Sequence, residues 1–266
     1  MTRTDHPIGY DAAEYASSKH YPYRLWVEKW SVFSTLQQLE LSLVNATAGD
    51  FGSGTGTYTR LLLDWGAHHV LAIDGDHQMI EQARKDSFLY NNNITYRHSL
   101  LETTKGREDL TVVLGNYLFS YPQSLEDVTR YCQALSSHLS EGGIFISFGN
   151  NPFDRKSHIQ YKPYGFNKEY SAEKKGDNDG AWVDYYVDGI NQPIRNYNLF
   201  PETYNHAFAL AGLKLFWNPP SLHPAEQNNP YWEDFFEDQP PFHMMIATKG
   251  ASPIDIKKRL AGAFTL

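Results

Sequence analysis

The sequence predicts an α/β protein built on a doubly wound, mostly parallel sheet of seven strands. Three observations favour this fold. A glycine-rich turn at residues 50–58 separates a strand of small residues from a helical run. A strand that ends in Asp74 follows that helix. Further apolar runs then alternate with helical patterns as far as residue 148. Such alternation is typical of parallel strands joined by crossover helices.

The turn suggests a site for a nucleoside. Its glycines, Gly52 and Gly54 among them, allow a sharp bend and let a ligand approach main-chain N–H groups closely. Asp74 comes twenty residues after Gly54, and an acid at such a strand tip suits the two hydroxyls of a ribose. The glycine spacing is not that of a dinucleotide site, because position 57 is threonine. Asp50 would also repel a pyrophosphate, whereas it suits an ammonium or sulfonium group.

The remaining elements follow from hydrophobic periodicity. Strands are expected at 46–49, 69–73, 94–98, 110–114, 144–148, 214–217 and 243–248, and helices at 24–39, 58–65, 76–84, 125–139 and 201–211. In the helix at 24–39, Trp26, Trp30 and Phe33 form an apolar stripe with Leu36 or Leu39, which we expect to pack on the sheet. The strand at 46–49 lacks the bulky residues that a buried parallel strand normally carries.

The chain divides into five segments by composition. We expect an N-terminal arm and lid helix over 1–42, a ligand-binding core over 43–150, an inserted cap over 151–200, a closing helix and strands over 201–250, and a tail over 251–266. The cap is polar but rich in tyrosine, with short strands predicted at 182–187 and 192–197. The tail is either a docked helix or a mobile end.

Charge and cysteine content exclude several function classes. A net charge of −8 and a pI near 5.7 disfavour nucleic acid as the main partner, since phosphate binding needs a basic face. Cys132 is the only cysteine, so no intrachain disulfide can form and a cytoplasmic setting is expected. No signal peptide and no apolar run of membrane-spanning length is found, so no membrane partner is predicted. A monomer or homodimer is expected, without a metal.

The pattern D-x-G-x-G-x-G, followed by a strand that ends in an acid, resembles motif I and the second-strand acid of class I S-adenosylmethionine (SAM) methyltransferases. The stretches at 10–39, 50–84 and 229–249 look like small-molecule methyltransferases, the toxoflavin-synthase type among them. The resemblance implies a Rossmann-like fold whose last strand is antiparallel, SAM as the cofactor and in-line methyl transfer. It also implies that Tyr15, Tyr23 and Arg24 close over the methionine end of SAM.

The chemical groups of SAM suggest a role for each predicted residue. Asp74 is expected to bind the ribose, Met79 with Ser99 and Leu100 the adenine, and Arg24 the carboxylate. The main chain at Gly52 and Asn116 would accept from the ammonium group. The predicted cofactor-binding residues are Tyr15, Tyr23, Arg24, Gly52, Gly54, Asp74, Gly75, Met79, Ser99, Leu100 and Asn116.

The acceptor pocket is expected between the cap and residues 116–117. Its predicted wall is aromatic and suits a planar heterocycle or another aromatic metabolite: Tyr161, Tyr164, Trp182, Tyr186 and Tyr204. Aromatic faces stabilise a sulfonium, and Tyr117 is a candidate beside Tyr15 and Tyr23. An amine or ring-nitrogen acceptor needs no base, whereas a phenol would need one, with His206 or His158 as candidates.

Three other functions share features with this sequence. Asn151-Pro152-Phe153 imitates the N-P-P-[YFW] motif of nucleic-acid base methylators, but it follows the fifth predicted strand rather than the fourth. A SAM-binding protein of a natural-product pathway that no longer methylates would use the same cofactor residues, so it stays open. A nicotinamide-dependent oxidoreductase is disfavoured by the glycine spacing.

Overall fold

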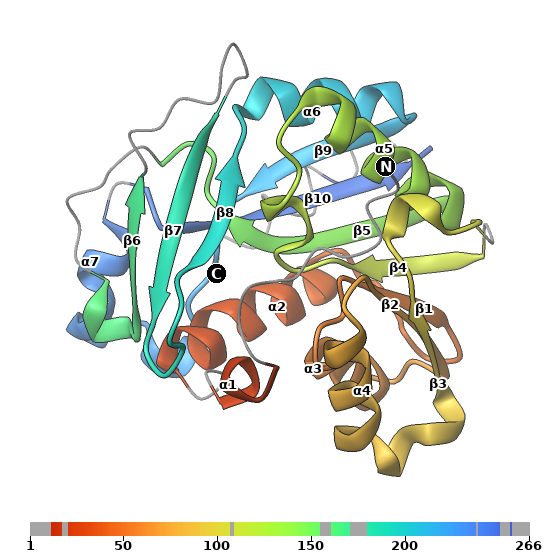
Figure 1. Ribbon diagram of the computed structural model, residues 1–266, viewed down its shortest axis with the longest axis horizontal. Coiled ribbons are helices and arrows are strands. Elements are labelled where there is room, and N and C mark those ends of the chain that lie inside the picture. The colour runs from red at the N-terminus through yellow and green to blue at the C-terminus, as the bar shows by residue number, and fades with distance from the viewer. Residues whose placement is uncertain are drawn as a thin grey trace.

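The computed structural model describes residues 12–17, 21–106, 109–154, 161–170, 180–237, 239–250 and 256. Seven strands form one sheet in the order β3-β2-β1-β4-β5-β10-β9 (Figure 1). Their bounds are β1 Thr47–Phe51, β2 His69–Asp74, β3 Ile94–His98, β4 Leu110–Leu114, β5 Leu139–Asn150, β9 Leu213–Asn218 and β10 Phe242–Lys249. Only β10 runs antiparallel to its neighbours, β5 and β9, within this sheet. The predicted doubly wound sheet is therefore confirmed.

Helices cover both faces of the sheet. The α-helices are α1 Ala12–Ser17, α2 Trp30–Gln38, α3 Thr57–Asp64, α4 His77–Asp86, α5 Leu125–His138, α6 Pro201–Leu210 and α7 Glu233–Phe236. A π-helical segment, η2 Arg24–Lys29, leads into α2. Short 3₁₀ turns are η3 Phe88–Asn93, η4 Leu101–Thr103, η5 Leu118–Ser120, η6 Lys162–Tyr164, η7 Pro224–Glu226 and η8 Pro230–Trp232.

Strand alternation separates two hydrophobic cores. On β4, Val112 and Leu114 lie in the core that α2 and α3 cover, whereas Val113 lies in the core that α5 and α6 cover. Figure 1 shows these two helix layers on opposite sides of the sheet. Period-two alternation within buried strands thus assigns each residue to a helix layer.

The small residues of β1 are explained by its neighbours. A Cβ at Gly49 would lie 3.0 Å from both Leu110 Cδ1 and Val113 Cγ2, so their side chains fill the space that a larger residue would need. β1 nevertheless pairs in parallel with β2 and β4. The bulk that this strand lacks is supplied by the strand beside it.

The helical range at 24–39 is confirmed, but of its predicted apolar stripe only Leu36 and Leu39 are fully buried. Val27, Val32 and Leu36 are buried against the sheet, while Trp26 and Trp30 are only half-buried. Both tryptophan rings instead contact the His223 ring, at centroid distances of 5.0 and 4.5 Å. The proline-rich loop before η7 therefore covers the tryptophan stripe, which periodicity alone cannot distinguish from packing on a sheet.

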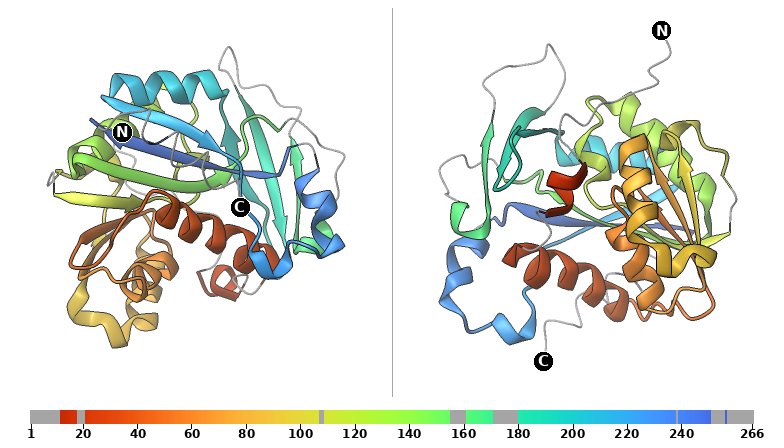
Figure 2. Two further views of the ribbon diagram at one scale, coloured as in Figure 1. Left: turned by 180° about the vertical axis from the view of Figure 1, so that it is seen from behind. Right: turned by 60° about the horizontal axis from the view of Figure 1, so that its bottom comes forward.

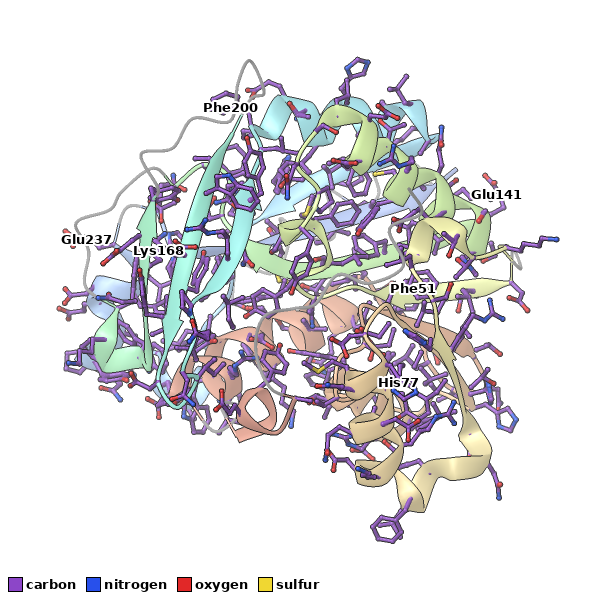
Figure 3. The ribbon with its side chains drawn as sticks, in the orientation of Figure 1. Phe51, His77, Glu141, Lys168, Phe200 and Glu237 are labelled. Atoms are coloured by element: carbon purple, nitrogen blue, oxygen red, sulfur yellow. The ribbon has the colours of Figure 1, made fainter. Side chains whose placement is uncertain are left out.

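A second, smaller sheet stands at one end of the large one. It contains β6 Phe166–Tyr170, β7 Ala181–Val187 and β8 Ile194–Asn198, all antiparallel. β7 and β8 confirm the two predicted short strands, whereas β6 was not predicted. Figures 1 and 2 show α1 between this sheet and α4. Lys168, labelled on β6 in Figure 3, forms a buried ion pair with Asp154 and so anchors the small sheet.

Within the described ranges, no helix is long and apolar enough to cross a membrane. His158, proposed as a possible base, and all of the tail except Ile256 lie outside the described residues.

Candidate functional site

The glycine turn connects β1 to α3 and lies over the end of β2. The N–H groups of Gly52 and Ser53 both donate to the carbonyl of Ile73, at 2.8 and 3.0 Å. Gly54 has a φ of +52°, in the left-handed region that favours glycine. The nearest atom to a Cβ built there would be Cε1 of Tyr15, at 3.8 Å. The turn is thus held on one side and open toward a cavity on the other.

Asp74 at the tip of β2 is tied to the same turn. Its Oδ2 accepts from the N–H of Gly54 at 2.7 Å, and its Oδ1 accepts from the N–H of Asp76 at 2.8 Å. Burial raises the pKa of the Asp74 carboxyl to about 6, although both backbone hydrogen bonds favour the ionised form. The side chain therefore presents its remaining lone pairs to a ligand from a partly desolvated position.

Three cavities meet at this point, and Tyr15 and Tyr117 line all of them. The first, of about 120 Å³, is called the Asp74 cavity. It contains most of the predicted cofactor residues: Tyr15, Gly52, Gly54, Asp74, Gly75, Met79, Ser99, Leu100 and Asn116. Tyr121 and Tyr131 also line it and were not predicted. Nine of the eleven predicted cofactor residues therefore lie around one cavity.

The second, of about 320 Å³, is called the Asp50 cavity. It shares Gly52, Gly54 and Asn116 with the Asp74 cavity. Asp50 is buried and its Oδ2 accepts from Oγ1 of Thr59 at 2.6 Å. Three carboxylates line this space, together with three cationic side chains: Glu28, Asp50 and Asp64, and Arg24, Lys29 and Arg60. It can therefore hold a ligand that carries both positive and negative charge, as the amino-acid end of a zwitterion does.

Glu28 is the main site residue that sequence reasoning missed. Its Oε1 accepts from the hydroxyl of Tyr58 at 3.0 Å and its Oε2 from that of Tyr117 at 2.6 Å. Nη1 of Arg24 lies 3.7 Å from Oε2, with both side chains largely buried. The sequence does contain a signal for this residue, because Glu28 is an acid on the apolar side of a predicted helix, four residues after Arg24. Such a residue is expected to be paired when buried.

Arg24 stands between the Asp50 cavity and the third cavity. Its guanidinium carbon lies 5.2 Å from the ring centroid of Tyr15, 5.5 Å from that of Tyr23 and 5.9 Å from that of Tyr117. Among the described residues, no acceptor lies within hydrogen-bond distance of its buried Nε. Arg24 thus retains a donor that a carboxylate could satisfy.

Tyr117 has a backbone conformation that tyrosine rarely adopts, with a φ of +60°. Its N–H donates to the carbonyl of Phe148 at 2.8 Å, which fixes the turn after β4. Burial, followed by the charge of Glu28, raises the pKa of its hydroxyl well above the ordinary value. Tyr117 is therefore a protonated, fixed ring where the three cavities join. Strain of this kind is concentrated at functional sites.

The third cavity, of about 40 Å³, is called the aromatic cavity. Tyr23, Phe166, Tyr185 and Phe242 form its walls, with Tyr23 stacked on Phe242 at a centroid distance of 5.4 Å. Tyr23 lies here rather than in the Asp74 cavity. The aromatic cavity lies between the small sheet and the large one, because β6, β7, β8, β5 and β10 all contribute to it.

None of the five residues predicted to bind the acceptor lines the aromatic cavity. Tyr161 and Tyr164 are buried in the core beside α7, and Tyr204 is buried under α6 with its hydroxyl donating to the carbonyl of Phe119. Trp182 and Tyr186 lie on β7 with the opposite alternation to Tyr185, so they face away from this cavity. Tyr185 and Phe242 occupy the predicted role of an aromatic wall instead.

The proposed base His206 is exposed on α6 and is not among the residues that line the three cavities. The structure therefore does not bring His206 to the three cavities, and the exposure of a histidine on a helix cannot be read from the sequence.

Residues 49–143 match the methyltransferase domain family. A search of curated proteins found no significant match. A SAM-dependent methyltransferase from Listeria monocytogenes has a similar structure, with 18% identity, a TM-score of 0.60, and coverage of 84% of this chain and 98% of that one. A SAM-dependent methyltransferase from Clostridium acetobutylicum has 16% identity and a TM-score of 0.61, covering 89% and 97%.

SAM-bound CalS10, an amino pentose methyltransferase from Micromonospora echinaspora involved in calicheamicin biosynthesis, has 14% identity and a TM-score of 0.60, covering 90% of this chain and 97% of that one. Similarity at these identities shows the fold. The toxoflavin-synthase subtype stays a prediction. The methyltransferase domain match contains the glycine turn and Asp74, and the chain has the fold of these solved SAM-dependent methyltransferases.

Proposed function

We propose that this protein transfers the methyl group of SAM to a nitrogen or oxygen of a small, neutral aromatic or heterocyclic metabolite. The observation that carries the proposal is the meeting of three cavities at Tyr15 and Tyr117. Two of them have the residues for a nucleoside and for a charged amino-acid group. The third is aromatic and adjoins both.

The residues present fit SAM. Asp74 would hold the ribose hydroxyls, and Met79 and Leu100 would lie along the adenine. The orphaned Nε of Arg24 would bind the carboxylate, while Asp50 and Glu28 supply the negative charge that an ammonium group requires. The open left-handed turn at Gly54 leaves the room that a close approach needs. Each part of the cofactor therefore has a matching group.

When bound, SAM supplies a methyl group on a positively charged sulfur. Around that position the chain provides the rings of Tyr15 and Tyr117, and each aromatic face stabilises a cation by about 0.5–2 kcal/mol. The same rings exclude water from the junction. Holding two reactants in line can lower the barrier by roughly 7–11 kcal/mol. Tyr117 would act as such a wall, since its hydroxyl donates to Glu28 and stays protonated.

The aromatic cavity supports a neutral acceptor. No carboxylate is found among the described residues that line it, and Arg24 is the only charged one of that set. The charge of Arg24 would repel a cationic amine there, whereas a flat neutral ring could lie against the aromatic walls. The similarity to an amino pentose methyltransferase of a biosynthetic pathway supports a small-molecule acceptor in general.

The test uses SAM with a radiolabelled methyl group and a fractionated metabolite extract. Label is expected in a small neutral aromatic product, together with formation of S-adenosylhomocysteine, and Asp74→Ala should abolish both. Label in protein or nucleic acid, or in a cationic aliphatic amine, would contradict the proposal. Binding of SAM without formation of S-adenosylhomocysteine from any fraction would instead favour a non-methylating SAM-binding protein.

A further inference from the structure

Two asparagines connect the small sheet to the large one inside the aromatic cavity. Asn150 ends β5 and Asn196 lies on β8, and both line the cavity. Nδ2 of Asn196 donates to Oδ1 of Asn150 at 3.4 Å. This long contact uses one polar atom of each side-chain amide, so the other polar atom of each amide takes no part in it.

The unused atoms are a donor and an acceptor. Nδ2 of Asn150 and Oδ1 of Asn196 are both buried, and neither has a hydrogen-bond partner among the described residues. Asn196 as a whole is only 5% exposed. Exchanging the amide nitrogen and oxygen of both residues changes nothing, because one donor and one acceptor still remain. Buried polar groups of this kind are normally satisfied, so an unpaired donor beside an unpaired acceptor points to a ligand.

The surroundings restrict the ligand further. Tyr23, Phe166 and Phe242 form apolar walls, and Tyr23 and Phe242 stack directly on each other at a centroid distance of 5.4 Å. A ligand that satisfies both asparagines must present an N–H beside a C=O along one edge. A flat ring can lie against these aromatic side chains while its edge reaches the asparagines. A ring that contains an amide has both properties.

We propose that Asn150 and Asn196 recognise the amide edge of a cyclic amide (lactam) or imide ring, which makes them determinants of acceptor specificity. The ring N–H donates to the free asparagine oxygen, and the ring C=O accepts from the free asparagine N–H. The inference rests on the proposed function, because it places the acceptor in the aromatic cavity. It adds the chemical class of the acceptor, which charge and aromatic walls alone do not define.

Two small probes differ only at the predicted contact. 2-Pyridone has the N–H beside its C=O, and 1-methyl-2-pyridone has a methyl group in place of that hydrogen. Their dissociation constants are measured by NMR titration of the full chain in saturating S-adenosylhomocysteine. Leaving a buried polar group unpaired weakens binding by about tenfold, so the wild type should bind 2-pyridone about tenfold more tightly.

Variants separate recognition from a structural role. The double variant Asn150→Leu/Asn196→Leu should bind the two probes equally, because it removes the acceptor in either orientation of the two amides, whereas Asn196→Asp keeps an acceptor and should keep the preference for the N–H. Asn198→Leu is the matched control, because Asn198 is equally buried on the same strand and also has an unpaired Nδ2, yet does not line the cavity. It should leave the wild-type preference unchanged.

Equal or undetectable binding of the two probes to the wild type would overturn the inference. So would a preference that survives in the double variant Asn150→Leu/Asn196→Leu. Calorimetry with SAM on the same samples distinguishes this failure from that of the proposed function. If SAM binds while the lactam preference is absent, only the acceptor class is wrong. If SAM does not bind, the proposed function itself fails.

Discussion

The hydroxyl of Tyr117 donates a 2.6 Å hydrogen bond to Oε2 of Glu28, which joins the turn after β4 to the helical segment that carries Arg24. The other oxygen of Glu28 accepts from Tyr58 on α3. One buried carboxylate therefore fixes three elements around the Asp50 cavity. The site depends on this carboxylate for its shape, and the residue lay outside the predicted set.

Replacing Glu28 by Gln should lower the free energy of unfolding by about 1–3 kcal/mol, because Arg24 loses its buried partner and one tyrosine hydroxyl loses its acceptor. Urea unfolding measures the change. Tyr58→Phe is the control, since it removes one hydrogen bond without removing charge, and it should lower stability by about 1 kcal/mol. An equal loss in both variants would show that the pairing with Arg24 contributes nothing.

SAM affinity should fall at acid pH. The pKa of Asp74 is raised to about 6 by burial, and only the ionised form accepts from both ribose hydroxyls. From pH 7.5 to pH 5 the dissociation constant should therefore increase about tenfold, as measured by calorimetry. The stability of the ligand-free protein should depend on pH in the opposite direction. Since the folded pKa lies above the unfolded one, Asp74 makes the ligand-free protein less stable as the pH rises from about 4 to 6.

His98 provides the control for this pH dependence. Its Nε2 lies 3.2 Å from the carbonyl of Gly75, and its charge acts to lower the pKa of the Asp74 carboxyl. His98→Gln should keep the pH dependence of SAM binding. A flat profile in that variant would assign the effect to the imidazole.

Gly54→Ala should lower stability by about 1–2 kcal/mol, because its φ of +52° is unfavourable for any residue with a Cβ. It should also weaken SAM binding by about tenfold or more, since the new methyl group would stand in the cavity. Gly142→Ala is the matched control. Gly142 has a φ of +76° with no atom within 4 Å of an added Cβ, so stability should fall equally while SAM affinity stays unchanged.

Tyr185 and Tyr186 test the alternation of β7. Tyr185 is 5% exposed and lines the aromatic cavity, whereas Tyr186 is 44% exposed. Tyr185→Ala should destabilise the protein by about 3 kcal/mol and Tyr186→Ala by no more than about 0.5 kcal/mol. Equal unfolding midpoints in urea would mean that the small sheet faces the other way.

The two halves of the site differ in how far sequence could predict them. The cofactor half depends on one contiguous unit, the glycine turn and the strand that ends in Asp74, so periodicity and motif located it directly. The acceptor half is formed by β5, β6, β7, β8 and β10, which are distant in sequence. A one-residue difference in strand alternation decided between Tyr185 and Tyr186. Glu28 was missed because its partners come from three separate elements.

The fold, too, could be predicted where local sequence determines it and could not where distant segments meet. The parallel strands and their crossover helices were located because each carries its own periodic pattern. The buried face of the helix at 24–39 was predicted only in part, because Trp26 and Trp30 pack on His223 from a loop about two hundred residues away. Contacts between distant segments decide which apolar side chains face the sheet, and a single sequence does not contain them.

A crystal structure with S-adenosylhomocysteine tests the central claim most directly. We predict the ribose hydroxyls within hydrogen-bond distance of Asp74, the carboxylate at Arg24, and the sulfur at the junction of Tyr15 and Tyr117, facing the aromatic cavity. A ligand whose amino-acid end enters the aromatic cavity, or whose ribose does not contact Asp74, would contradict the account.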